Sequence, residues 1–314
     1  MNMSQRQLSM FVATATLAHI TQASEALHIS QPALTRALRA FENQLGCRLF
    51  SRTTRRVTLT PEGALLLPRA QALLRQMSAA QEAVRGHTGQ LQGPVTIAVG
   101  TAFACTVLPI ALTALNAQHP GLRLRIIDDN SQGITARVAR AEVEIGIGSL
   151  MGRTTTVASE KLLTAPLGLV GRAESLPCQP SVCVSDVNGS LLLQEPEDSS
   201  IAHSLSAQGS DWRKKMERGT EVSSLAIQLA MAQAGAGLAV MSALGASHPQ
   251  AKGLRFVPLR PRLQREVFLM HHIHHPPDEA TATVCDFIRW ALAQAALLPG
   301  IKRVASNTAI NPKP

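Results

Sequence analysis

The sequence predicts an α/β protein in three parts: a small helical unit closed by a β-hairpin, one long helix, and a larger region of alternating strands and helices. Three patterns lead to this prediction. Apolar residues recur at helical spacing up to residue 45, a second helical run covers residues 61–84, and short apolar strands alternate with helices after residue 92. With 314 residues, the chain is long enough for two or three domains with cores of their own.

Two short helices are predicted at the start of the chain. The first begins near Gln5 and buries Leu8, Phe11 and Val12 along one face. The second is shorter, and we expect Thr21 to cap it, because a threonine hydroxyl accepts from the unpaired amides of a first helical turn.

A third helix follows a tight turn at residues 28–29. Ser30 is expected to cap it, and Pro32 falls in the first turn, where a missing N–H costs little. Its apolar stripe is predicted to contain Leu34, Leu38 and either Phe41 or Leu45. The opposite face carries arginine and hydrogen-bonding side chains, so it suits an anionic partner.

The second and third helices together form a predicted helix-turn-helix, whose last helix enters the major groove of DNA. Gln31 is expected to pair with adenine, and Pro32 to touch a thymine methyl group. Thr35 and Arg36 are expected to reach bases or phosphates. With the hairpin described next, the predicted DNA contacts are Ser30, Gln31, Pro32, Thr35, Arg36, Arg39, Arg52, Arg55 and Arg56.

Residues 48–60 alternate apolar and polar side chains, which predicts a β-hairpin. Arg52, Arg55 and Arg56 on this hairpin suit a wing that contacts phosphates or the minor groove. The alternative is a basic surface that faces only solvent.

The distribution of charge supports a double-stranded DNA partner. The net charge is +9, and residues 1–90 hold ten Arg, no Lys and four Glu, so +6 of it lies in this part of the chain. Arginine favours bidentate contacts with phosphate and guanine over diffuse attraction.

Several other classes of protein are disfavoured. The first twenty residues already form a helix, so no signal segment is expected, and five cysteines without framework spacing suit a reducing, cytoplasmic location. The apolar stretch 223–246 is interrupted by glutamines and glycines, which predicts a helix, a turn and a strand instead of a membrane span. HExxH, GxSxG and P-loop motifs are missing from the sequence, so we expect neither enzymatic activity nor a cofactor.

A long helix is predicted from Pro61 to about Val84. Its apolar residues follow the spacing of a coiled-coil seam, which consists of Leu66, Ala70, Leu73, Met77, Ala80 and Val84. We expect this seam to pair two chains, so that two recognition helices read an interrupted palindrome about one DNA turn apart. The alternative is a helix that packs on its own domain. Pro68 predicts a kink near the start.

The third region begins after a hinge at residues 87–93. Strands at 95–99, 122–126 and 143–147, separated by helices at 101–118 and 132–141, predict a parallel sheet with helices on its faces. A second unit of this kind is predicted from strands at 165–170, 191–193, 238–241 and 267–271 and helices at 199–208, 223–234 and 281–297.

Residues 30–63, SQPALTRALRAFENQLGCRLFSRTTRRVTLTPEG, resemble the N-terminal domain of the LysR-type transcriptional regulators. His19 and Ser24 depart from the family pattern, but neither lies on the helix that faces DNA. The resemblance continues more loosely through LP at 108–109, HPGLRL at 119–124 and QAGAGLAVM at 233–241. Two further departures, Glu142-Val143-Glu144 and Ser242, make the alignment of pocket residues less secure.

The resemblance implies a winged helix-turn-helix, a linker helix and a periplasmic-binding-protein-like domain of two α/β subdomains that binds an effector. It also implies a dimer of dimers that contacts RNA polymerase and activates transcription. The expected domains are 1–60 for DNA binding, 61–91 for the linker, 92–302 for the effector (subdomain I, 92–164 and 266–302; subdomain II, 165–265), and a disordered tail, 303–314.

Ligands of open α/β sheets bind beyond the carboxyl ends of the strands. Hydroxyls and helix amides at those positions suit a small anion, although any one of these residues taken alone is better explained as an ordinary helix cap. The expected effector contacts are Thr101, Ala102, Phe103, Asn130, Ser131, Ser149, Gln194, Ser199, Ser223 and Ser224.

Two other features stay open. Four histidines at residues 271–275 suggest a metal site, but they have no Cys or carboxylate partner at ligand spacing, so a solvated loop is the preferred interpretation. Cys178 and Cys183 are close enough in sequence for a disulfide switch, which the resemblance does not support. The predicted function is a LysR-type regulator controlled by a small, anionic effector. A regulator without ligand control and a solute-binding protein remain the alternatives.

Overall fold

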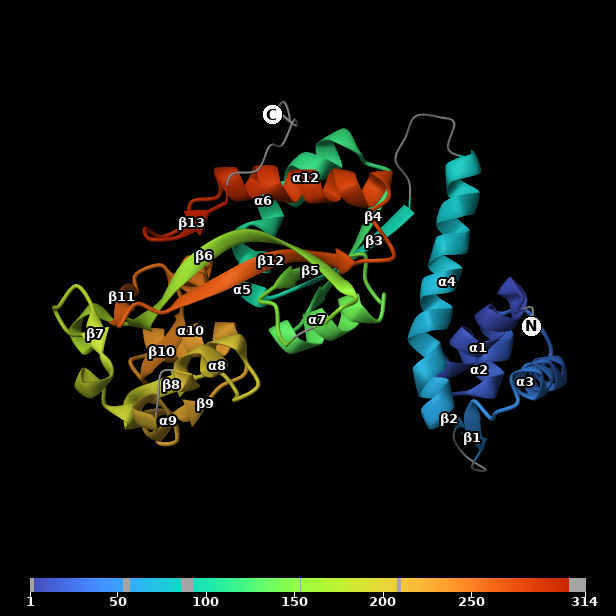
Figure 1. Cartoon of the computed structure of the whole chain (residues 1–314), viewed down its shortest axis with the longest axis horizontal. Coiled ribbons are helices and arrows are strands. Elements are labelled where there is room, and N and C mark those ends of the chain that lie inside the picture. Colours follow the sequence, from blue (N-terminus) through green and yellow to red (C-terminus); the bar gives the residue numbers. More distant parts are fainter. Residues whose placement is uncertain (1–2, 53–56, 86–92, 153, 208–209, 305–314) are drawn as a thin grey trace. The chain divides into compact units, whose positions relative to one another are not determined.

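The structure is a computed structural model that describes residues 3–52, 57–85, 93–152, 154–207 and 210–304 (Figure 1). The chain divides into two compact units, an N-terminal one up to Gln90 and a C-terminal one from Leu91 onward. Each unit has its own hydrophobic core.

The N-terminal unit begins with three helices, α1 (Gln5–Leu17), α2 (Ile20–Ala26) and α3 (Gln31–Leu45). Ser4 caps α1 by accepting from the amide of Gln7, whose side chain bonds back to Ser4. The predicted cap of α2 was wrong: the N-cap lies two residues earlier, at His19, which forms no side-chain cap bond. Thr21 instead supplies a carbonyl that accepts from the Ser24 hydroxyl.

The apolar stripe of α3 is confirmed. Leu34, Leu38 and Phe41 are buried, while Leu45 is half-buried. The ring of Phe11 from α1 lies against Phe41, which joins the first and third helices in one core. Ser30 caps α3 as predicted, by accepting from the amide of Ala33.

The predicted hairpin is formed by β1 (Phe50–Arg52) and β2 (Val57–Leu59), which pair antiparallel with Phe50 opposite Leu59. Glu42 in the last turn of α3 holds the start of the hairpin in place. The Glu42 carboxylate accepts from the backbone amides of Leu49 at 2.8 Å and Phe50 at 3.1 Å. The turn between the strands, which carries Arg55 and Arg56, lies outside the described residues.

The long helix is α4 (Pro61–Arg85), which continues without a break through Pro68. The predicted seam was wrong in its first part. Leu66 and Ala70 pack into the core of the N-terminal unit against α1, as the alternative interpretation required. Leu73 and Met77 remain exposed at 39% and 38%. The side chains of Ala80 and Val84 lie outside the described residues.

The first half of the C-terminal unit is the predicted parallel arrangement. Strand β3 (Gly93–Val99) lies between β4 (Leu122–Asp128) and β5 (Ile145–Gly148) and runs parallel to both. The predicted helix 101–118 is two helices, α5 (Thr101–Thr106) and α6 (Leu108–Gln118). Helix α6 packs with α12 (Glu279–Gln294) on one face of the sheet, and α7 (Ser131–Ala139) packs on the opposite face (Figure 1).

The second half centres on β10 (Leu238–Ser242), which is parallel to β8 (Leu192–Gln194) and antiparallel to β6 (Val157–Gly171). Strand β8 in turn pairs with β9 (Thr220–Glu221). The remaining elements here are α8 (Ser200–Ser206), α9 (Ser210–Met216), α10 (Leu225–Gln233), α11 (Ala243–Ala246), β7 (Val182–Cys183), β11 (Arg255–Arg260) and four 3-10 turns at 173–175, 184–186, 189–191 and 249–251.

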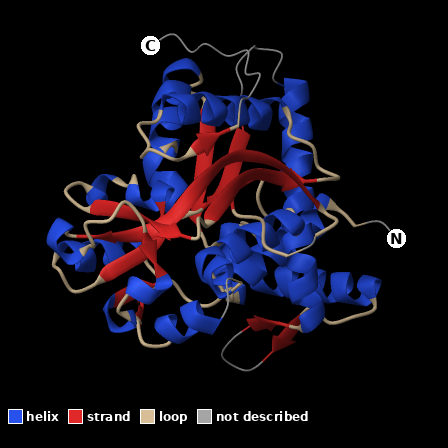
Figure 2. Ribbon diagram, turned by 60° about the vertical axis from the view of Figure 1, so that its left-hand side comes forward, coloured by secondary structure: helices blue, strands red, loops and turns tan. Residues whose placement is uncertain are grey.

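Two long antiparallel strands connect the halves, β6 (Val157–Gly171) and β12 (Gln264–His272) (Figures 1 and 2). The expected subdomain borders at 164/165 and 265/266 fall inside these strands, which therefore run from one subdomain into the other. Strand β13 (Lys302–Arg303) pairs with β6, so Arg303, the first residue of the predicted disordered tail, is part of a strand. Residues 305–314 lie outside the described part. The apolar stretch 223–246 forms the expected helix (α10), turn and strand (β10), and ends in the short helix α11, which was not expected.

Candidate functional site

One candidate site is the outward face of α3. Gln31, Pro32, Arg36 and Arg39 are exposed, and Thr35 is half-buried. Among the described residues, none of the side chains of Gln31, Arg36 and Arg39 forms a hydrogen bond or ion pair. The buried stripe on the opposite side holds the helix, so these donors are available to an external partner.

The wing gives a less complete picture. Arg52 ends strand β1, but its side chain, like the whole of Arg55 and Arg56, lies outside the described residues. Arg48, just before the strand, is exposed. The predicted DNA contacts on α3 therefore share one surface, and those on the wing stay predictions.

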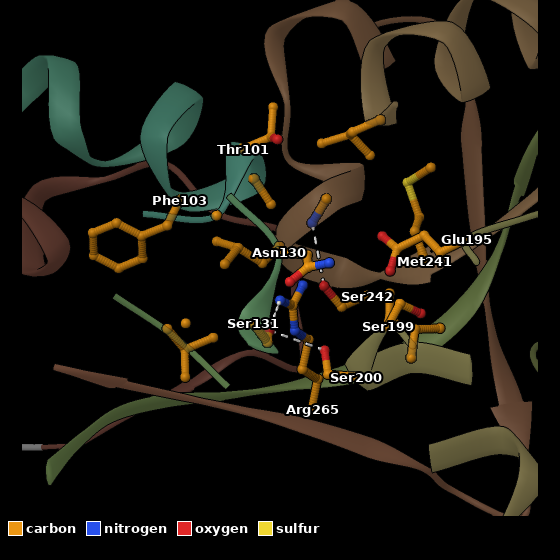
Figure 3. Close-up of a pocket in the computed structure, with 18 of the residues that line it drawn as sticks. Thr101, Phe103, Asn130, Ser131, Glu195, Ser199, Ser200, Met241, Ser242 and Arg265 are labelled. Atoms are coloured by element: carbon orange, nitrogen blue, oxygen red, sulfur yellow. Dashed lines mark hydrogen bonds between the residues drawn. The ribbon is translucent and has the colours of Figure 1, made fainter. Parts of the chain in front are cut away.

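The second candidate site is a cavity of about 280 Å³ in the C-terminal unit, between its two subdomains (Figure 3). Loops that follow β3, β4, β5, β8 and β10 contribute to its wall, as does strand β12. Seven of the ten expected effector contacts line it: Thr101, Ala102, Phe103, Asn130, Ser131, Ser199 and Ser223.

Arg265 is the polar centre of this cavity. It projects from β12 and donates from Nη2 to the Ser131 hydroxyl at 3.3 Å (Figure 3). Its Nε donates to the Ser149 hydroxyl at 3.0 Å. Ser149 donates its own proton to the carbonyl of Glu266 at 2.7 Å, so its oxygen is oriented to accept from Arg265. The guanidinium keeps further N–H donors that no described residue accepts.

The environment of Arg265 is dry for a cation. Burial lowers its pKa from the ordinary arginine value, and the nearby carboxylate of Glu195 opposes this shift. Arg265 forms no ion pair with any carboxylate in the described parts of the chain. A half-buried guanidinium without a counter-ion has a high affinity for a carboxylate or phosphate oxygen.

Four carboxylates also line the cavity. Asp129 is neutralised by Arg137, whose Nε lies 2.7 Å from Oδ2. Asp128 accepts from the Thr101 hydroxyl at 2.9 Å, and Asp198 from the amide of Asn130 at 3.3 Å. Glu195 has no hydrogen-bond partner among the residues that the structure places.

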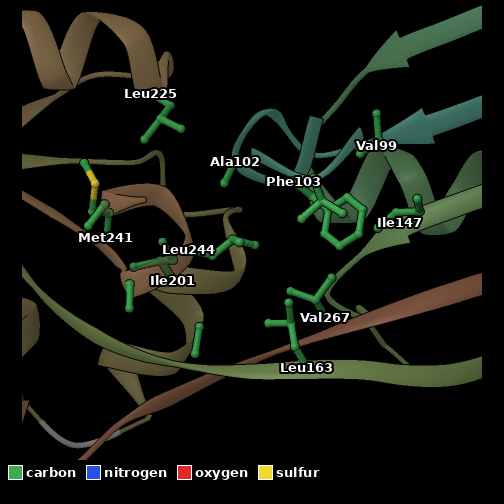
Figure 4. Close-up of a cluster of buried hydrophobic side chains, with 14 of the residues drawn as sticks. Val99, Ala102, Phe103, Ile147, Leu163, Ile201, Leu225, Met241, Leu244 and Val267 are labelled. Carbon is green, nitrogen blue, oxygen red and sulfur yellow. The ribbon is translucent and has the colours of Figure 1, made fainter. Parts of the chain in front are cut away.

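Apolar side chains form the rest of the wall. Phe103, Ile147 and Val267 are buried on the side of the first subdomain (Figure 4). Leu225, Met241 and the other apolar residues of the second subdomain face them across the cavity. Such a lining holds the carbon skeleton of a ligand while a few polar groups orient it.

Three expected contacts do not line the cavity. Ser149 lies behind it and holds Arg265. Gln194 turns away, because its side-chain amide donates to the carbonyl of Met216 at 2.6 Å. Ser224 stands at the N-cap of α10 without a side-chain bond, and its neighbour Ser223 is the one that faces the cavity.

Sequence reasoning missed several lining residues, above all Arg265. This residue lies at the start of a strand, whereas the expectation was limited to residues that follow strands. Ser242, which replaces an expected proline, also lines the cavity and accepts from the amide of Gly245. The acidic residues Glu195 and Asp198 are adjacent in sequence to two expected contacts, Gln194 and Ser199. Their positions were therefore a signal in the sequence that carboxylates lie near the site.

The histidines at 271–275 do not form a metal cluster. His272 contacts the rings of His274 and His275, with centroids 5.7 and 4.6 Å away. Burial and the neighbouring histidines lower the pKa of His272. No group of three or more His, Cys, Asp or Glu able to hold a metal is found in the described residues.

The cysteines are not bonded to one another. Cys178 is exposed, and Cys183 accepts from Nε of Arg260 at 3.1 Å. Within the described residues, none of the helices combines the length and the apolar character that a membrane crossing requires.

Comparison with known families accounts for both units. Residues 5–64 match the bacterial regulatory helix-turn-helix protein, lysR family, and residues 88–293 match the LysR substrate binding domain. Together the two matches include α3, the wing and every lining residue of the cavity.

Individual proteins show the same similarity. The chain is 27% identical to the uncharacterized HTH-type transcriptional regulator YbhD of Escherichia coli K12. The aligned 250 residues cover 79% of each chain. It is 36% identical over 148 residues to a probable hydrogen peroxide-inducible genes activator of Mycobacterium xenopi, covering 47% of this chain and 78% of that protein.

Solved structures agree on the fold. A full-length OxyR variant from Pseudomonas aeruginosa matches with a TM-score of 0.71 at 24% identity, covering 94% of this chain and 98% of that one. CbnR in complex with its target DNA matches with a TM-score of 0.62 at 19% identity, covering 92% and 100%.

Proposed function

The chain belongs to the LysR family of transcriptional regulators, and from this membership we propose that it is a DNA-binding regulator controlled by a small molecule in the cavity at Arg265. It acts on transcription by binding, and not as an enzyme. The observation that carries the proposal is the coexistence of an unpartnered basic helix face in one unit and an unpaired, half-buried arginine in a cavity of the other.

DNA binding is supported by the surface of α3. Gln31 and Pro32 lie in the first turn of the helix, the part of a recognition helix that meets base edges. Arg36 and Arg39 lie one and two turns further on and suit phosphates. The DNA in the CbnR structure shows that a chain of this fold binds such a partner.

The assembly we propose is a dimer of dimers. Leu73 and Met77 form an exposed apolar pair on α4 and do not belong to the core of the N-terminal unit, which Leu74 between them contacts. Pairing of these residues between two chains sets two recognition helices on an interrupted palindrome. Contact with RNA polymerase and a cytoplasmic location belong to the same proposal.

Control by ligand is supported by the shape of the cavity. Its wall comes from both subdomains, so a ligand that contacts both stabilises a closed arrangement over an open one. An anionic group of the ligand binds Arg265, where three guanidinium donors have no partner in the described residues.

Selection from a pool of random duplex DNA tests the proposal. The purified chain should enrich an interrupted palindrome with half-sites about one helical turn, roughly 34 Å, apart. Its affinity for the best site should fall steeply as salt is raised. Enrichment of no sequence would contradict a role in specific DNA binding.

A further inference from the structure

The cavity at Arg265 is more acidic than a site for a simple anion should be. Of its lining carboxylates, Asp129 is neutralised by Arg137. Asp128, Glu195 and Asp198 remain against one guanidinium, which leaves a formal charge of −2. A ligand that carries only negative charge meets attraction from Arg265 and repulsion from three carboxylates.

None of these three carboxylates is tied to a cation by an ion pair in the described residues. Asp128 and Asp198 accept only from neutral groups, the Thr101 hydroxyl and the Asn130 amide. Glu195 accepts no hydrogen bond from a described residue, and its charge acts on Arg265 at longer range. Their remaining lone pairs are open to a donor from a ligand.

We propose that the effector is a small zwitterion of the amino-acid type, whose carboxylate binds Arg265 and whose ammonium group lies among Asp128, Glu195 and Asp198. This inference rests on the proposed function and defines the ligand of the same cavity. A carboxylate on the guanidinium and an ammonium on the acidic side bring the charge of each side closer to neutrality.

The size and lining of the cavity fit this class. A volume of about 280 Å³ admits a molecule at the small end of the ligands that protein pockets bind. The apolar surface of Phe103, Leu225 and Met241 suits an aliphatic side chain that branches from the carbon carrying both charged groups. Because the two charges of the ligand are recognised by opposite charges, a molecule that lacks either one loses a charge-assisted contact.

Calorimetric titration of the full chain tests the proposal with matched sets of probes. Each set contains one of the standard L-amino acids, the 2-oxo acid with the same skeleton, and the amine that lacks the carboxylate. We expect at least one amino acid to bind, and both of its partners to bind about tenfold more weakly or worse, since each lost charged hydrogen bond has about this effect.

Variants identify the group that recognises the ammonium. Glu195→Gln and Asp198→Asn should each weaken binding of the amino acid about tenfold and improve the relative affinity of the 2-oxo acid. Arg265→Gln should weaken the amino acid and the 2-oxo acid alike, and the amine least. Glu197→Gln is the matched control, because Glu197 is exposed and does not line the cavity.

A 2-oxo acid that binds as tightly as its amino acid would overturn the proposal, and so would a panel in which no amino acid binds. Titration of the selected DNA with the same preparation separates this failure from that of the proposed function. Specific DNA binding without amino-acid binding would contradict the zwitterionic effector and leave the proposed regulator standing. Absence of specific DNA binding by the wild-type chain would contradict the proposed regulator itself.

Discussion

Arg265 and Ser131 are 134 residues apart in the chain, yet Nη2 of the arginine lies 3.3 Å from the hydroxyl of the serine. The arginine comes from β12, one of the two strands that connect the subdomains, and the serine from the first turn of α7. The same hydroxyl lies 3.4 Å from that of Ser200 at the start of α8, in the second subdomain. A short chain of polar contacts therefore runs from Arg265, the only lining arginine among the residues described, through Ser131 to the second subdomain.

Replacement of Ser149 by alanine should destabilise the C-terminal unit. The hydroxyl accepts from Arg265 and donates to the carbonyl of Glu266, so its removal takes one partner from each of two partly buried hydrogen bonds. We expect a loss of about 1–3 kcal/mol in the free energy of unfolding, measured by urea denaturation. Ser223→Ala is the control, since Ser223 is exposed and has no side-chain bond to a described residue. Equal stability of the two variants would contradict the positioning of Arg265 by Ser149.

Gln31→Ala should relax base preference as well as weaken binding, because a bidentate contact with adenine distinguishes bases by about 1–3 kcal/mol. Arg36→Ala should weaken binding to all sequences more evenly and reduce the slope of affinity against salt. Both are measured by fluorescence anisotropy on the selected site and on its single-base variants. The base-reading role of Gln31 is wrong if its variant loses the same factor on every sequence.

Replacement of Leu73 and Met77 together by glutamate should dissociate the paired chains, because these exposed residues continue the predicted seam. Multi-angle light scattering measures the mass of the assembly. Leu65→Glu is the control: Leu65 is 61% exposed but lies off the seam, so its variant should keep the mass of the wild type. Leu66→Glu should instead unfold the N-terminal unit, since Leu66 packs against its core. An unchanged mass for the double variant would rule out the seam.

Alkylation of thiols should depend strongly on position. Burial raises the pKa of Cys285 to about 12, so near pH 8 its reactive thiolate is on the order of a thousandfold rarer than that of an ordinary cysteine. Iodoacetamide at this pH should therefore modify exposed Cys178 and leave Cys285 intact, as judged by mass spectrometry of peptides. Raising the pH to 9 should not change this pattern, because the thiolate forms only near the raised pKa. Fast labelling of native Cys285 would show that its surroundings open.

Local patterns predicted the fold well. The stripe of Leu34, Leu38 and Phe41 and the parallel order of β3, β4 and β5 follow from spacing that short segments carry. The prediction for α4 wrongly assigned Leu66 to the surface that pairs two chains. Spacing shows that Leu66 and Leu73 share a helix face, but it does not show which neighbours cover each of them. Ala70 is buried in the N-terminal core whereas Leu73, about one turn further along, is 39% exposed, and only packing in space distinguishes the two.

The cavity was predicted less completely for the same reason. Thr101, Asn130 and Ser199 were found because they follow strands, and the carboxyl ends of neighbouring strands meet. Arg265 reaches the cavity from the side, on a strand whose register against β6 is set by long-range pairing. Its role depends on contacts with residues more than a hundred positions away, which a single sequence does not show.

Genome-wide footprinting of the protein in its native host tests the central claim most directly. The account predicts protected sites that share an interrupted palindrome next to a limited set of operons, whose products would narrow the effector to one group of metabolites. Diffuse protection without a shared sequence would contradict it, because the exposed face of α3 would then bind DNA only through its charge.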